Sequence, residues 1–189
     1  MFDKNLVNNM SLKPDINLLM LWDKQKPDIT NKVILDFFKI PYIEHSYEYK
    51  MGAIPTWDGK KLCFSNSANE KDFGWVIHEI SHMIITPKES FRKPNYGLGE
   101  DPGGGAKCDY TGPCMVSVLD DETITCFLDI FIFEKLGLES EIPKHLDEYN
   151  IYLNSGELKM IEEALLYNGF PIKIIMDCYK KYVPFPLDT

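Results

Sequence analysis

The spacing of apolar residues along the chain predicts a protein built mostly of helices. In several segments apolar residues recur three or four positions apart, which places them on one face of a helix. These segments are residues 15–23, 28–39, 67–86, 119–138, 143–153, 155–168 and 171–182. Capping residues support their boundaries: Asp28 or Thr30 can cap the second segment. Ser67 with Glu70 fits a capping box in the third, and Gly137 can end the fourth.

Two shorter segments have the composition of strands. Residues 42–49 (YIEHSYEY) and 60–65 (KKLCFS) combine apolar and aromatic residues, and residues 57–60 (WDGK) supply a turn before the second. We therefore expect a small antiparallel sheet beside the helices, in a chain of the α+β class. The second strand can belong to the core, or it can be an edge strand to which an extended peptide adds.

Residues 92–118 interrupt this pattern with many Gly, Pro and polar residues. A loop of this length inside a compact domain is usually functional or mobile. Its segment GEDPGGGAK lacks the pattern of a phosphate-binding loop, so we expect the rim or lid of a site. Tyr96 and Tyr110 lie in this loop, where each can either pack at the surface or donate a hydrogen bond to a developing oxyanion.

Composition and charge narrow the classes of partner. Apolar residues make up 44% of the chain and charged residues 26%, as in an ordinary globular protein. The net charge of −9 disfavours binding to nucleic-acid phosphates or anionic membranes. No window reaches the roughly 18 apolar residues of a membrane span, and no apolar signal-peptide core is visible. We therefore expect no nucleic-acid or membrane partner, a cytoplasmic location, and cysteines that are mostly free thiols.

Two of the four histidines stand four residues apart in WVIHEISHMIIT, residues 75–86. On a helix, His78 and His82 lie about 40° apart on one face, with Glu79 beside them. The apolar residues gather on the opposite side, at Phe73, Val76, Ile77, Ile80, Met83 and Ile84. We therefore expect the two histidines to point together away from the core.

This arrangement of residues favours a zinc site. Two histidines one helical turn apart can supply two ligands to Zn²⁺, and the adjacent glutamate can deprotonate a metal-bound water. That is the chemistry of the H-E-x-x-H pattern, and the pattern lies on a predicted helix, as it must. The alternative is an amphipathic helix that contains two histidines by coincidence.

A third ligand has to come from elsewhere in the chain. His145 is a weaker candidate, because PKHLDEY reads as the start of a surface helix. The acidic residues 120–122 begin the second strongly apolar helix, and Glu122 is the preferred ligand there, with Asp121 as the second choice. The same acids can instead only cap that helix and complement its dipole.

Asp129 is a carboxylate within the apolar run of this second helix. A charged side chain in such a place is seldom buried without a partner. We expect Asp129 to accept a hydrogen bond from the second ring nitrogen of a ligating histidine, a common role beside zinc.

With these residues the sequence resembles the zincin metallopeptidases, and among them the gluzincins, as found in small single-domain zincins of bacteria and phages. The resemblance covers roughly residues 40–137 and implies His78, His82 and Glu122 as zinc ligands and Glu79 as the general base. It departs from the family's E-x-x-x-D pattern, since position 126 is Cys and the carboxylate follows at Asp129.

Together these observations predict a single zincin-like domain over residues 1–189. N-terminal helices occupy 1–40, the metal-site core with its small sheet 41–137, and a C-terminal helical cap 138–189. The expected activity is Zn²⁺-dependent hydrolysis of a peptide bond through a metal-bound water, on a specific protein or peptide substrate. The alternative is a catalytically inactive zincin-like binding or regulatory protein, with a structural metal or none.

Overall fold

The structure is a computed structural model that describes residues 13–23, 28–45, 57–65, 73–86, 90–93, 121–149, 158–159, 162–163, 165–166 and 169–183. At residues 44–45, 64–65, 121–123 and 148–149 only the backbone is described. In chain order the elements are the 3-10 helix η2 (Ile16–Leu21), α1 (Asn31–Phe37), β1 (Tyr42–His45), β2 (Leu62–Ser65), α2 (Phe73–Ile85), α3 (Asp121–Leu136), the 3-10 helix η5 (Glu139–Glu141), α4 (Ile142–Tyr149) and α6 (Ile172–Tyr182).

The helices predicted at 28–39, 67–86, 119–138, 143–153 and 171–182 correspond to α1, α2, α3, α4 and α6, and several of their predicted ends fall outside the described residues. Thr30 caps α1, and its side chain accepts a hydrogen bond from the backbone N–H of Val33. Gly137, with a φ of 80°, follows the end of α3. The expected capping box at Ser67 and Glu70 lies outside the described residues. The first helical segment is a 3-10 helix rather than an α-helix.

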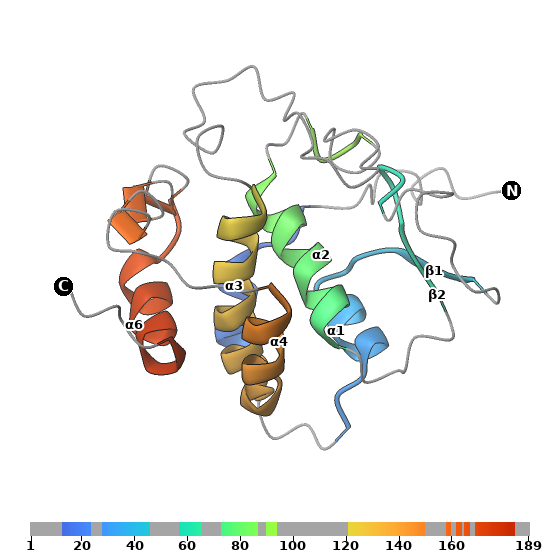
Figure 1. Cartoon of the computed structure of the whole chain (residues 1–189). Coiled ribbons are helices and arrows are strands. Elements are labelled where there is room, and N and C mark those ends of the chain that lie inside the picture. Colours follow the sequence, from blue (N-terminus) through green and yellow to red (C-terminus); the bar gives the residue numbers. More distant parts are fainter. Residues whose placement is uncertain are drawn as a thin grey trace, which may run out of the picture.

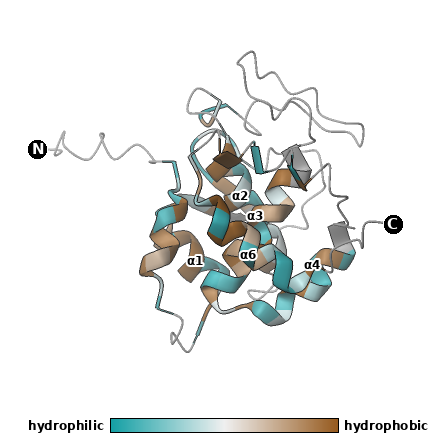
Figure 2. Cartoon of the chain, turned by 90° about the vertical axis from the view of Figure 1, so that its left-hand side faces the viewer, coloured by the Kyte–Doolittle hydropathy of each residue, from teal (hydrophilic) through white to brown (hydrophobic). Residues whose placement is uncertain are grey.

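Helix α3 is the centre of the fold. It packs against α2 on one side and α6 on another, and it also contacts α4 and η2 (Figure 1). Its side chains from Ile124 to Glu134 are all buried. Buried apolar residues from η2 to α6 form one cluster around it. Figure 2 shows both hydrophilic and hydrophobic residues along α4 and α6, as expected of helices that bury only one side.

The two strands pair in parallel, so the predicted antiparallel sheet is wrong. Tyr42 lies opposite Leu62, and the register continues to His45 opposite Ser65. The turn residues do make an antiparallel contact, but a local one, in which Trp57 bridges Leu62. The segment between the strands exceeds the dozen or so residues that a parallel crossover needs.

Gly59 makes that local turn possible. Its φ of 90° is strained for any residue with a side chain, and a Cβ there would collide with the backbone carbonyl oxygen of Arg92. Beside it, the indole N–H of Trp57 donates a hydrogen bond to the carbonyl oxygen of Phe91, at 2.6 Å. The turn is thereby fixed to the segment that follows α2.

Within the described residues, no helix combines the length and apolar character that crossing a membrane requires.

Candidate metal centre

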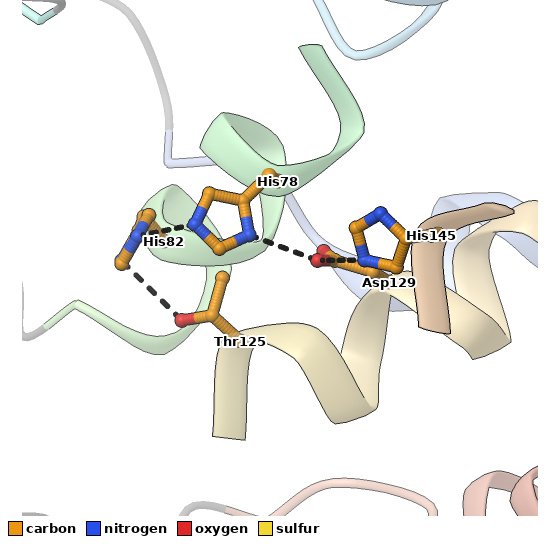
Figure 3. Close-up of polar contacts among 5 residues, drawn as sticks. All are labelled: His78, His82, Thr125, Asp129 and His145. Carbon is orange, nitrogen blue, oxygen red and sulfur yellow. Dashed lines mark hydrogen bonds and ion pairs between the residues drawn. The ribbon is translucent and has the colours of Figure 1, made fainter. Parts of the chain in front are cut away.

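The two motif histidines face each other on α2. Their Nε2 atoms are 3.2 Å apart, and the rings meet edge to face with their centroids 4.7 Å apart (Figure 3). Two nitrogens that each lie about 2.05 Å from one tetrahedral zinc ion are themselves about 3.3 Å apart. The same distance suits a hydrogen bond from one Nε2 to the other. The pair is therefore spaced to share either a proton or a metal ion.

The other ring nitrogen of each histidine is held by α3. Nδ1 of His78 lies 2.9 Å from Oδ2 of Asp129, and Nδ1 of His82 lies 3.3 Å from Oγ1 of Thr125. Since an ionised carboxylate only accepts, His78 donates through Nδ1–H and its Nε2 lone pair is directed to His82. Fixing of the outer nitrogen by a carboxylate or hydroxyl is the usual support of a metal-ligating histidine. The hydrogen bond to Asp129 that we expected from the sequence is present.

Asp129 joins a third histidine to this pair. Its Oδ2 also accepts a hydrogen bond from Nε2 of His145, again at 2.9 Å, and its side chain is fully buried. Burial raises the pKa of Asp129, but electrostatic attraction to the His78 and His145 rings and the hydrogen bonds from them outweigh burial, and they hold that pKa below its ordinary value. The carboxylate is therefore ionised and bridges two imidazoles, as the close-up shows (Figure 3).

The predicted surface position of His145 is wrong, since the residue is 2% exposed. It lies on α4 three residues after Ile142, which is fully buried, and just before Leu146, which packs against the core. These positions share one face of a helix, and that face packs on α3. In the sequence, His145 shares one helix face with the apolar residues Ile142 and Leu146. This spacing was the signal that could have predicted a buried His145.

The expected outward direction of the motif residues is also wrong. His78, Glu79 and His82 are only 6%, 8% and 5% exposed. Helix α2 is buried on both sides, because α3 covers the face that bears the histidines. The apolar stripe of α2 marks one buried face, but it does not show that the polar face is open to solvent.

A second set of possible ligands lies on the Asp129 side of His78. One ligand atom each from His78, Cys126 and Asp129 lie within 4.8 Å of one another, and all three side chains are buried. This buried group could hold a metal ion. Sequence reasoning missed Cys126, although it stands three residues before Asp129 on the same face of α3.

The remaining candidates are outside what the structure describes. Asp121 and Glu122 belong to the first turn of α3, but only their backbone is described. Tyr96 and Tyr110 lie outside the described residues altogether. Thr125, which contacts His82, was not predicted; it stands four residues before Asp129, one turn earlier on the same face.

Comparisons of the chain with models of protein families, with curated proteins and with solved structures found no match.

Proposed function

We propose that the chain binds Zn²⁺ between His78 and His82 and hydrolyses a peptide bond there. The observation that carries this proposal is the 3.2 Å separation of the two Nε2 atoms. It is the spacing that a tetrahedral zinc ion imposes, and Asp129 and Thr125 hold the outer nitrogens so that both lone pairs can meet. The side chains thus fit the metal that the resemblance to gluzincins implies.

Each residue has a separate part in this proposal. A bound zinc ion supplies a Lewis acid that activates water and polarises the scissile carbonyl. Glu79, next to His78 on α2, accepts the proton of the attacking water and passes it to the leaving amine. Glu122, in the first turn of α3, is the proposed third ligand. Asp129 fixes the ring of His78 and its tautomer.

The proposed substrate is a peptide segment of a specific protein. A peptidase with an open site would endanger its own cell, and the motif residues here are nearly all covered. We propose a reducing compartment such as the cytoplasm, because the cysteines in the described part of the chain, Cys63, Cys126 and Cys178, are not joined in disulfides.

One observation favours a second function, a zincin-like protein that binds a metal or a partner but does not cleave. The E-x-x-x-D pattern of the gluzincins, counted back from Asp129, reaches Thr125 rather than a glutamate. A threonine hydroxyl is a poor zinc ligand, so the third position then depends on Glu122, three residues earlier. Without that ligand the site would hold a metal weakly or keep it for structure.

Metal content tests the zinc site on which both metal assignments depend. The wild-type chain, His82→Ala and Ser81→Ala would be purified without chelator or an affinity metal, and their zinc measured by elemental mass spectrometry. Ser81 is buried on the same helix and is the matched control. We expect about one zinc per chain in the wild type and Ser81→Ala, and none in His82→Ala. Cleavage of a peptide library would then distinguish a peptidase from a metal-holding protein, and absence of metal in the wild type would contradict both metal assignments.

A further inference from the structure

The proposed metal site extends into the C-terminal part of the chain through His145. This residue belongs to α4, beyond the segment that bears the motif, and its Nε2 atom lies 2.9 Å from Oδ2 of Asp129. The same oxygen lies 2.9 Å from Nδ1 of His78. Both contacts are shielded from water, with Asp129 fully buried and His145 2% exposed.

We propose that His145 is a positioning residue that fixes the Asp129 carboxylate and, through it, the orientation and tautomer of His78. Oδ2 of Asp129 takes both histidine N–H groups, while Oδ1 has no hydrogen-bond partner among the described residues. Two donors on one oxygen define its direction, whereas a single donor leaves the carboxylate free to turn about its Cβ–Cγ bond.

The position of His145 is itself fixed by packing. The ring lies 5.1 Å from the ring of Phe133 on α3, measured between centroids. A small surface pocket lined by Gly74, Glu141 and Lys144 reaches the same two rings. Gly74 belongs to α2 and Lys144 to α4, so this is the junction of the motif helix with the C-terminal cap. The packing of α4 on α3 therefore places His145 against Asp129, the same carboxylate that contacts His78 (Figure 3).

Three variants of the full-length chain test this inference. His145→Leu removes the N–H donor but keeps the volume, and His145→Gln restores an amide N–H near the place of Nε2. Ile142→Ala is the control, because Ile142 is buried on the same helix and takes no part in the hydrogen bonds. It should loosen α4 without removing the donor.

Two readouts are needed. The first is the nitrogen NMR shifts of the imidazoles in metal-free protein, which report the tautomer of His78. The second is zinc affinity by competition with a chelating indicator, and this part rests on the proposed metal site. We expect His78 to be protonated at Nδ1 in the wild type and in His145→Gln, and to exchange between tautomers in His145→Leu. Zinc affinity should fall about 10-fold in His145→Leu, as for other residues that support ligands, and recover in His145→Gln.

Each outcome decides the inference. An unchanged His78 tautomer in His145→Leu overturns it, and so does an equal change in Ile142→Ala, which would mean that only the stability of α4 matters. If the wild type binds no zinc, the proposed function fails, but the tautomer in metal-free protein still decides the role of His145. Should His145→Leu not fold, His145→Asn, whose amide is too short to reach Asp129, makes the same comparison with His145→Gln.

Discussion

Asp129 on α3 holds His78 on α2 through a buried hydrogen bond of 2.9 Å. One turn away along both helices, the hydroxyl of Thr125 lies 3.3 Å from Nδ1 of His82. Asp129, the later of the two residues on α3, contacts His78, the earlier of the two on α2. The two helices therefore run in opposite directions. Helix α3 thus presents to the two motif histidines of α2 a pair of polar residues at the same four-residue spacing.

Zinc should raise the stability of the wild-type chain. A ligand that binds only the folded state at about 100 times its Kd stabilises it by about 2.7 kcal/mol. For a chain of this length that corresponds to a rise in Tm of about 5–10 °C. Thermal unfolding with zinc and with a chelator measures the difference. His82→Ala should melt at one temperature in both conditions, and a wild type that did the same would contradict the metal site.

Glu79→Gln should separate metal binding from catalysis. The substitution keeps the size of the side chain but removes the base, so we expect zinc content within about two-fold of wild type and a loss of turnover of at least about 100-fold. Peptide cleavage and metal content would be measured on the same preparation. Loss of zinc from this variant would instead show that Glu79 holds the metal.

The third ligand can be identified with cobalt in place of zinc. If Glu122 is the ligand, Glu122→Gln should weaken binding about 10-fold or more, whereas Cys126→Ser should have little effect. If Cys126 is a ligand, as its buried cluster with His78 and Asp129 allows, the cobalt protein should show a sulfur-to-metal charge-transfer band that Cys126→Ser abolishes. Asp121→Asn is the control, since it removes a neighbouring charge on the same turn.

Local features of the chain were predictable from the sequence. Thr30 caps α1 and Gly137 follows the end of α3, because capping depends on residues a few positions apart. The contact between Asp129 and a motif histidine was also predictable, since a carboxylate in an apolar helix needs a partner.

Features that depend on packing between segments far apart in the sequence were not predictable from local residue patterns. The strands were expected to be antiparallel because a turn lies between them. That turn instead joins Trp57 to Leu62 in a local antiparallel bridge, and β1 pairs with β2 in parallel. Burial of His145 required knowing that α4 lies on α3. The apolar face of a single helix does not indicate whether a second helix covers its polar face.

Cys178 should resist alkylation in the folded protein. Burial raises the pKa of its thiol to about 12, and the nearby charge of Glu134 acts in the same direction. Only the thiolate is an effective nucleophile, so at pH 8 the thiol is almost entirely unreactive. Mass spectrometry after brief iodoacetamide treatment should find Cys178 unmodified in native protein and modified after unfolding in urea. Rapid modification under native conditions would show that α6 does not pack on α3 as described.

The ion pair between Glu134 on α3 and Lys181 on α6 should make stability depend on acid pH. Their charged atoms lie 2.8 Å apart, and the Glu134 side chain is 10% exposed. Burial raises the pKa of Glu134, but hydrogen bonds from Lys181 and Cys178 outweigh it, and the net pKa is below its ordinary value of 4.5. A carboxyl group with a lowered pKa in the folded state stabilises above its unfolded pKa, and this contribution is lost as the pH falls through the folded value.

Glu134→Gln should therefore lower the free energy of unfolding by less than about 1 kcal/mol at pH 7, since one partner is exposed. The difference should shrink as the pH falls below the ordinary pKa of 4.5 and vanish once the pH is below the folded pKa of Glu134. Urea unfolding at a series of pH values measures it. The control is Asp177→Asn, which breaks the exposed pair between Lys173 and Asp177 on α6, 2.6 Å apart, and should change little at any pH because water screens both charges. A difference for Glu134→Gln that does not shrink between pH 6 and pH 3 would mean that the side chain acts through packing rather than through its charge. In that case α6 is held to α3 by apolar contacts such as the stacked rings of Phe127 and Tyr179.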